Sequence, residues 1–257
     1  MKEQITVVKV GGAIVEDEAL LDQLLDNFCA IEGKKVLVHG GGRRATKVAA
    51  ALGIETTMVN GRRITDAATL DVVTMVYGGL VNKNIVARLQ ARGINALGMT
   101  GADGNIIKAH RRPAKEGIDY GFVGDVDRAD GQMLAVLAGA SVVPVIAPLT
   151  HDGAGHLLNT NADTIASTVA KAQAPLYDVT HIYTFEKKGV LRNPDDEESL
   201  IPVITHSLFT EYVADGTISG GMIPKVENAL AAIDAGVGKV IITLATAIDG
   251  NHGTVIK

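Results

Sequence analysis

Short runs of aliphatic and β-branched residues alternate along this chain with longer stretches in which apolar residues recur at helical spacing. Runs of the first kind predict buried strands, and stretches of the second kind predict helices that cover them. We expect strands at 5–10, 36–38, 95–99, 142–147, 179–184 and 239–244, and a hairpin formed by 106–109 and 122–126. We expect helices at 18–31, 43–52, 66–77, 80–92, 132–138, 161–171 and 224–235.

This alternation predicts an α/β protein with a largely parallel sheet that is covered on both faces. The 257 residues fit one large domain or two lobes, and a hydrophobic share of 47% supports a sizeable core. The charged share is 21% and the formal net charge is −5, whereas a nucleic-acid-binding surface usually carries a clustered basic excess. Nucleic acid is therefore not an expected partner.

The single cysteine, Cys29, leaves no partner for an intrachain disulfide. It lies in an apolar helical pattern, which predicts a place in the core. The first residues lack the apolar segment and cleavage site of a signal peptide, and no apolar run approaches the about 18 residues that cross a bilayer. These observations favour a cytoplasmic protein with no membrane partner.

Two glycine clusters, Gly11-Gly12 and Gly40–Gly42, each follow one of the first two predicted strands. Without a Cβ atom, glycines let backbone N–H groups converge on an anion. The second cluster leads directly into a predicted helix, whose first N–H groups and dipole also favour negative charge. We interpret the first third of the chain as a phosphate- or carboxylate-binding region; the alternative is two ordinary strand-to-helix turns.

Familiar motifs for other chemistry are absent from the sequence. The glycine clusters match neither the P-loop pattern GxxxxGK[ST] nor the dinucleotide fingerprint GxGxxG. The segment HGGG also occurs in esterases, but those enzymes need a GxSxG nucleophile turn, which the sequence lacks. Direct phosphoryl transfer remains, a reaction that depends on positioning and charge neutralisation more than on covalent help.

Two lysines and one aspartate are the candidate catalytic residues. Lys9 comes just before Gly11-Gly12, and Lys225 follows the segment GGMIP at the start of a predicted helix. A lysine beside glycines is a suitable point charge for a phosphate. Asp163, at the start of another predicted helix, is placed to hold both lysines through its carboxylate. Taken singly, either lysine is better interpreted as a solvent-facing cation. Only the two lysines and Asp163 together indicate a phosphoryl-transfer site.

Six segments, spread in order over essentially the whole chain, resemble motifs of the amino-acid kinase family, and most closely those of the acetylglutamate kinases of arginine biosynthesis. They are VKVGGA, VHGGGRRA, VNGRRIT, LLNTNADT, SGGMIPKV and HGTVI. The resemblance implies a single domain with an open, mainly parallel eight-stranded sheet sandwiched between helices, a three-layer αβα fold similar to that of carbamate kinase. It also implies an acylglutamate-binding N-lobe of about 1–174 and an ATP-binding C-lobe of about 175–257.

The resemblance implies a role for each matching residue. Lys9 and Lys225 would stabilise the transferring phosphoryl group, and Asp163 would orient both lysines. The residues implied to hold the acylglutamate are Gly41, Gly42, Arg63 and Asn159. The residues implied to contact phosphate or ATP are Gly11, Gly12, Glu186, Gly189, Leu191, Thr217 and Ser219. Asn161 would either support the site or cap its helix.

The implied reaction is attack by the γ-carboxylate of N-acetyl-L-glutamate on the γ-phosphorus of ATP, which gives an acyl phosphate. A carboxylate is already ionised near neutral pH, so this attack needs no general base. We expect Mg²⁺ to accompany ATP, held mainly by nucleotide and water rather than by protein ligands. The sequence lacks the extra N-terminal helix of arginine-inhibited relatives, so we expect a homodimer without arginine feedback.

Two departures from the family pattern leave alternatives open. In the nucleotide-side segment 183–191, YTFEKKGVL stands where relatives show an LTDVxGVL-like sequence. The glycine and the apolar end match, but Glu-Lys replaces the Asp-Val pair. Arg62 replaces an apolar residue beside the substrate arginine, and a second cation there would suit N-succinyl-L-glutamate. Alternatively, Arg62 faces solvent, because neighbours on an extended segment point in opposite directions.

A protein of another class, a non-catalytic ligand sensor on the same fold, is the alternative to a kinase. A sensor could lose Lys9, Lys225 or Asp163 and still bind its ligand, and this chain has all three. The seven histidines form no metal-binding pattern, and we interpret His39, just before the second glycine cluster, as a packed turn residue.

Overall fold

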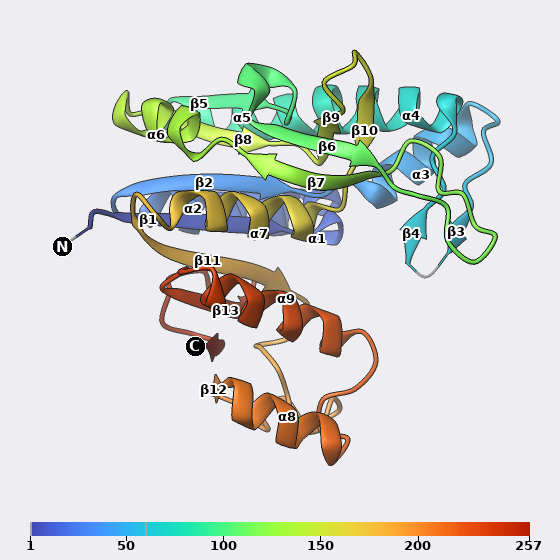
Figure 1. Ribbon diagram of the computed structural model, residues 1–257. Coiled ribbons are helices and arrows are strands. Elements are labelled where there is room, and N and C mark those ends of the chain that lie inside the picture. The colour runs from blue at the N-terminus through green and yellow to red at the C-terminus, as the bar shows by residue number, and fades with distance from the viewer. Residues whose placement is uncertain (1, 60) are drawn as a thin grey trace.

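A computed structural model, which describes residues 2–59 and 61–257, contains an eight-stranded sheet with helices on both faces (Figure 1). The strand order is β12-β14-β13-β11-β1-β2-β8-β5. The central strands are parallel, and β14 runs antiparallel to β13. The bounds are β1 (Gln4–Val10), β2 (Lys34–His39), β5 (Ala96–Met99), β8 (Val143–Ile146), β11 (Asp178–Phe185), β12 (Val203–Ile204), β13 (Lys239–Leu244) and β14 (Thr254–Ile256). The predicted fold class is confirmed.

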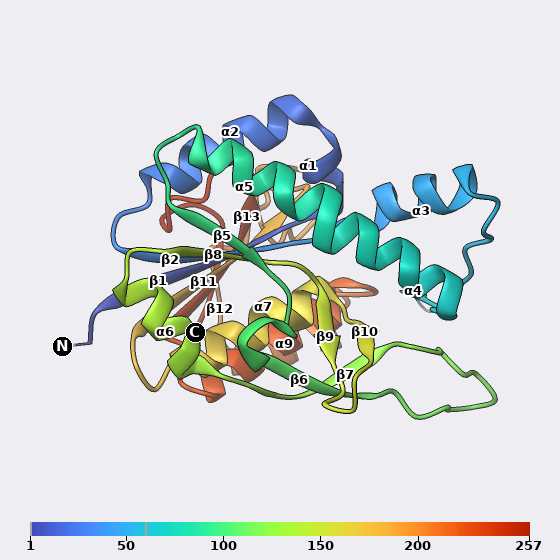
Figure 2. The ribbon, with the colours of Figure 1, turned by 90° about the horizontal axis from the view of Figure 1, so that it is seen from above.

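Alternating side chains of the central strands enter two separate cores. In β1, Val8 and Val10 belong to one core, and Ile5 and Val7 belong to the other. Figure 2 shows a layer of helices on each side of the large sheet. The first layer contains α1 (Gly12–Glu16), α2 (Glu18–Ala30) and α5 (Asn82–Gln90). The second contains α6 (Gly131–Gly139), α7 (Ala162–Gln173) and α9 (Met222–Asp234). This alternation places Lys9 on the face that α7 covers.

Two small sheets lie beside the carboxyl ends of β1 and β2. One has the order β10-β9-β6-β7 and the other pairs β3 with β4. Their bounds are β3 (Met58–Val59), β4 (Arg62–Arg63), β6 (Ile107–Arg111), β7 (Gly124–Ala129), β9 (Leu149–His151) and β10 (Leu157–Asn159). Helix α3 (Gly42–Ala51) starts at the same end of the molecule, and α8 (His206–Ala214) contacts α9 and β12 far from it (Figure 1).

The prediction of two helices at 66–77 and 80–92 is wrong. The chain forms one continuous helical run, α4 (Ala67–Val73), a π-helical segment (Thr74–Val81) and α5. The two predicted helices left Gly78 and Gly79 between them. Instead, the π-helical segment contains both glycines and joins α4 to α5.

The other predicted helices and the predicted strands are confirmed, with ends that move by a few residues, and the predicted hairpin is β6–β7. The prediction of a core position for Cys29 is only partly right, because its side chain packs against the core but is partly exposed. Elements that the sequence pattern did not predict are α1, α8, β3, β4, β9, β10, β12 and β14. Among the residues that the structure describes, every helix is too short or too polar to cross a membrane.

Candidate active site at the carboxyl ends of the strands

The two glycine clusters touch each other at the carboxyl ends of the neighbouring strands β1 and β2. Val10 pairs with His39 in the sheet, so the following residues leave the two strands side by side. A Cβ on Gly40 would lie 3.1 Å from the backbone N of Gly12, and a Cβ on Gly12 would lie 3.5 Å from the N of Gly41. The backbones can approach this closely because neither residue has a side chain.

Lys9 and Asp163 form an ion pair directly beside these glycines. The Lys9 Nζ lies 2.8 Å from Asp163 Oδ1. Burial alone would raise the pKa of the Asp163 carboxyl, but the charges of Lys9 and Lys225 outweigh it, so that this pKa lies below its ordinary value. Asp163 is therefore a charged carboxylate at neutral pH.

Asn161 fixes the start of α7, the helix that carries Asp163. Its side-chain oxygen accepts hydrogen bonds from the backbone N–H groups of Asp163 (2.8 Å) and Thr164 (3.3 Å), as an N-cap does. The structure confirms that Asn161 caps its helix, and a supporting role in the site stays a prediction.

Lys225, in the first turn of α9, faces the same space as Lys9. Its Nζ lies 4.8 Å from the centre of the Phe185 ring. In the described part of the chain, the Asp163 carboxylate forms its ion pair with Lys9 and not with Lys225. Burial lowers the pKa of Lys225, while the Asp163 carboxylate acts in the opposite direction. The Asp163 carboxylate thus contacts one lysine and acts on the other only through its field.

A cavity of about 410 Å³ is lined by both lysines and by Gly11, Gly12 and Gly42; we refer to it as the phosphate cavity. Lys9 and Lys225 line it, and so does Arg43, which the sequence analysis missed. The Arg43 guanidinium lies 3.5 Å from a carboxylate oxygen of Glu186 on the opposite wall, and both side chains are largely exposed. The predicted phosphate ligands in the lining are Gly11, Gly12 and Glu186.

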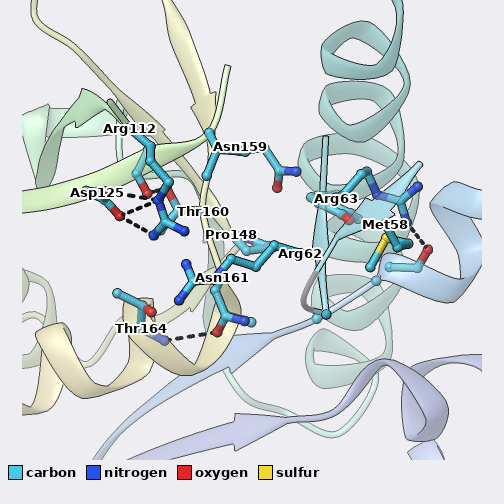
Figure 3. Close-up of a pocket in the computed structure, with 18 residues that line it drawn as sticks. Met58, Arg62, Arg63, Arg112, Asp125, Pro148, Asn159, Thr160, Asn161 and Thr164 are labelled. Carbon is cyan, nitrogen blue, oxygen red and sulfur yellow. Dashed lines mark hydrogen bonds and ion pairs between the residues drawn. The ribbon is translucent and has the colours of Figure 1, made fainter. Parts of the chain in front are cut away.

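A second cavity, of about 210 Å³, opens beside the second glycine cluster; we refer to it as the acyl cavity (Figure 3). It brings together the predicted substrate residues Gly41, Gly42, Arg62, Arg63 and Asn159.

Arg63 is held rigidly in the wall of the acyl cavity. It is 8% exposed, and its guanidinium donates hydrogen bonds to Thr56 Oγ1 (3.1 Å), Gly42 O (2.9 Å) and Thr46 Oγ1 (2.9 Å). The Asn159 side-chain amide donates to Thr65 Oγ1 at 3.0 Å. Fixed donors of this kind suit a carboxylate and the polar acyl-amino group of a small molecule.

The sequence model of the amino acid kinase family matches residues 4–244, a range that contains the glycines and lysines described above. The chain belongs to the amino acid kinase family. The acetylglutamate kinase of Bacteroides thetaiotaomicron is 67% identical over 257 residues, which cover 100% of both chains. That of Bacteroides fragilis is 66% identical, over 100% of this chain and 98% of its own. The smu.665 protein of Streptococcus mutans has a similar solved structure, with a TM-score of 0.77, 28% identity and 98% of each chain covered.

Arg112 is a further charged residue of the acyl cavity in this member of the family, and the sequence analysis missed it. Its Nε donates to both carboxylate oxygens of Asp125 (3.2 and 3.1 Å), and its guanidinium lies 5.6 Å from the centre of the Tyr120 ring. Figure 3 shows Arg62 and Arg112 extending toward one another across the cavity. The pair of arginines at the end of β6, Arg111 and Arg112, was the only signal in the sequence.

Arg62 enters the acyl cavity although its side chain is exposed. It also lines a neighbouring space of about 330 Å³ that contains Asp163 and Lys225. Although neighbours on an extended segment point apart, Arg62 and Arg63 both line the acyl cavity.

The predicted nucleotide contacts beyond Glu186 lie apart from both cavities. Gly189 serves close packing, since a Cβ there would lie 2.6 Å from both Leu200 Cδ1 and Thr254 Oγ1, and Leu191 is buried. The backbone N–H of Thr217 donates to Asp215 Oδ1, and Ser219 is exposed. The contacts of Gly189, Leu191, Thr217 and Ser219 with ATP stay predictions.

His39 is a packed residue below the glycines. It is fully buried, its Nδ1 donates to Gly40 O at 2.8 Å, and its Nε2 lies 3.1 Å from the Asn82 side-chain amide. Burial lowers the pKa of His39 to about 4, so the ring is neutral near pH 7. The structure shows it in the position of a packed turn residue, as we interpreted it.

Proposed function

We propose that this chain transfers the γ-phosphoryl group of ATP to the γ-carboxylate of N-acetyl-L-glutamate, a step of arginine biosynthesis, and releases N-acetyl-L-glutamyl 5-phosphate. The observation that carries this proposal is the Lys9–Asp163 pair beside the glycine clusters that border both cavities. One cavity offers lysines and glycine N–H groups for phosphate, and the other offers Arg63 and Asn159 for an acylated amino acid. Full-length identity of 67% with an acetylglutamate kinase supports the choice of substrate.

The proposed chemistry needs charge neutralisation and alignment. The γ-carboxylate enters from the acyl cavity already ionised, and no side chain has to remove a proton from it. Lys9, Lys225 and the N–H groups of Gly11 and Gly12 stabilise the negative charge on the phosphoryl oxygens as they pass between the two substrates. Asp163 keeps Lys9 pointed at these oxygens.

We propose that Mg²⁺ arrives with ATP and supplies further charge neutralisation at the phosphates. The carboxylates of the site are already engaged by cations, Asp163 by Lys9 and Glu186 by Arg43. Such a donor set fits a metal ion held mainly by phosphate oxygens and water.

We also propose that the two lobes bind different substrates. The acyl cavity is lined by residues from 40 to 164. The phosphate cavity adds Thr184, Phe185, Glu186 and Lys225, which come from beyond residue 174. This distribution supports an acylglutamate-binding N-lobe of about 1–174 and an ATP-binding C-lobe of about 175–257.

A hydroxamate assay tests this function. Purified protein, ATP and Mg²⁺ are incubated with hydroxylamine and, in turn, N-acetyl-L-glutamate, N-succinyl-L-glutamate, glutamate and aspartate. We expect ATP-dependent hydroxamate only with the acylated glutamates. No product from either acylglutamate would refute the kinase proposal and favour the alternative, a ligand sensor on the same fold.

N-succinyl-L-glutamate is a second candidate substrate because the acyl cavity holds more cations than an acetyl group requires. Arg62 and Arg112 reach this cavity in addition to Arg63 (Figure 3). A succinyl group would bring a carboxylate that these two arginines can bind. A kcat/KM ratio that favours the acetyl substrate, unchanged in Arg62→Ala, would exclude this alternative.

We further propose a homodimer that works in the cytoplasm, where ATP is abundant. The edge strand β5 exposes Leu97 to 43%, and the helical run beside it exposes Met75 to 54% and Leu80 to 42%. A second copy would cover these apolar side chains and the open sheet edge. Light scattering should give twice the chain mass of 26.8 kDa, and Leu97→Asp should give a monomer.

A further inference from the structure

The two catalytic lysines are held by different kinds of partner. Lys9 has a carboxylate oxygen 2.8 Å from its Nζ. The Nζ of Lys225 lies 4.8 Å from the centre of the Phe185 ring, within the range of a cation–π contact. Both lysines and Phe185 line the phosphate cavity, so the difference lies within one site.

The Phe185 ring is a fixed platform, whereas the lysine side chain is flexible. Phe185 is the last residue of β11, where it pairs with Leu244 of β13, and its side chain packs against the core below α7 and α9. Lys225 carries its ammonium on a four-carbon stem with several rotatable bonds. A contact with the ring therefore restricts where the ammonium can lie.

An aromatic ring holds a cation without consuming its hydrogen-bond donors. A carboxylate would accept one or more of the three N–H groups and would cancel most of the charge. The face of a ring attracts the ammonium through its quadrupole and leaves the charge and the donors available. In the phosphate cavity, those donors can turn to the phosphoryl oxygens as transfer proceeds.

We infer that Phe185 is a positioning residue for phosphoryl transfer, whose ring holds the Lys225 ammonium in the phosphate cavity with its donors free. This inference rests on the proposed kinase function.

Graded fluorination of Phe185 tests the inference, because fluorine weakens the negative face of the ring with little change in shape. Phe185 is replaced by mono-, di- and trifluorophenylalanine, and kcat and both KM values are measured. We expect kcat to fall stepwise, by about 5- to 30-fold in total, with the KM for the acylglutamate unchanged. Phe185→Tyr should retain most of kcat, and Phe185→Leu should lose as much as the trifluoro variant.

Phe209 provides the matched control, since it packs against the same core from α8 and lies outside the phosphate cavity. The same fluorinated residues at Phe209 should leave kcat unchanged. A flat series at Phe185, or equal losses at both positions, would overturn the inference. A series that changes only the KM for ATP would also overturn it, because the ring would then contact the nucleotide instead of positioning Lys225.

A second readout separates this inference from the proposed function. The ring current of an aromatic side chain shifts the NMR signals of protons that lie above its face. The ε-protons of Lys225 should therefore resonate upfield in the free wild-type protein and at the ordinary lysine chemical shift in Phe185→Leu. Lack of turnover in the wild-type protein would refute the kinase function, whatever the shift. An active wild-type protein with an ordinary Lys225 resonance would refute the role of Phe185 alone.

Discussion

Replacing Asp163 with asparagine preserves the size of the side chain and removes the negative charge that faces Lys9. The two charged atoms lie 2.8 Å apart, with the Lys9 side chain 11% exposed and that of Asp163 32% exposed. At an effective dielectric constant of about 20, unit charges at this separation attract by roughly 6 kcal/mol. Desolvation of both groups and the partial exposure of Asp163 offset most of this, and we expect a net loss of about 1–3 kcal/mol in the free energy of unfolding.

The effect of Asp163→Asn on catalysis should exceed its effect on stability. Without the carboxylate, the Lys9 ammonium is no longer directed at the phosphoryl oxygens, and kcat should fall by about 100-fold or more with little change in the KM for the acylglutamate. The hydroxamate assay measures both constants, and thermal unfolding measures stability. Asp249→Asn removes another aspartate, paired with His252 outside both cavities, and should leave kcat unchanged. A kcat for Asp163→Asn within about threefold of wild type would refute the role assigned to this carboxylate.

The same pair predicts a dependence of stability on pH. The pKa of Asp163 in the folded protein lies below its ordinary value, so the folded state favours the charged form. Its contribution to stability is therefore complete above the pKa of the unfolded chain, near 4, and is lost as the pH falls through the lowered pKa of the folded state. The difference in stability between wild type and Asp163→Asn should shrink across that acidic window.

Three further substitutions test other parts of the site. Arg43→Ala should raise the KM for ATP by about fivefold, because Arg43 lines the phosphate cavity. Arg44 does not line it, so Arg44→Ala should leave this KM unchanged, and equal effects of the two substitutions would refute a role for Arg43 in ATP binding. Gly40→Ala should lower kcat/KM by about tenfold or more, because the added Cβ would lie 3.1 Å from the backbone N of Gly12. Gly79→Ala is the control and should remain active, because no atom lies within 4 Å of the Cβ added there. Arg63→Lys should raise the KM for the acylglutamate by about 10- to 100-fold through lost hydrogen bonds to a carboxylate, and an unchanged KM would contradict its proposed role.

The phosphate side of the site could be predicted because it depends on elements that are close in the sequence. Lys9 and the first two glycine clusters follow β1 and β2, and parallel neighbours in a sheet bring such segments to one edge. The helix cap at Asn161 is likewise a local feature. Lys225 and Asp163 could be named as candidates from their places at the starts of predicted helices, but only the family resemblance indicated that they meet Lys9, since that approach depends on how α7 and α9 pack on the sheet.

The missed features depend on tertiary contacts without a local signal. Arg112 looks like an ordinary surface arginine until Asp125, across the β6–β7 hairpin, fixes its guanidinium. The contact between Phe185 and Lys225 joins residues that are far apart in the sequence. The π-helical run through Gly78 and Gly79 was missed for a different reason, because glycine lowers helix propensity and the sequence carries no local signal for a π-helical segment.

Phosphorus NMR of the wild-type protein with ATP, Mg²⁺ and N-acetyl-L-glutamate tests the central claim most directly. The account predicts that an acyl phosphate resonance grows in step with ADP as the γ-phosphate signal of ATP declines, and that Lys9→Ala abolishes this growth. Formation of inorganic phosphate in step with ADP, with no acyl phosphate even at early times, would contradict transfer to the carboxylate.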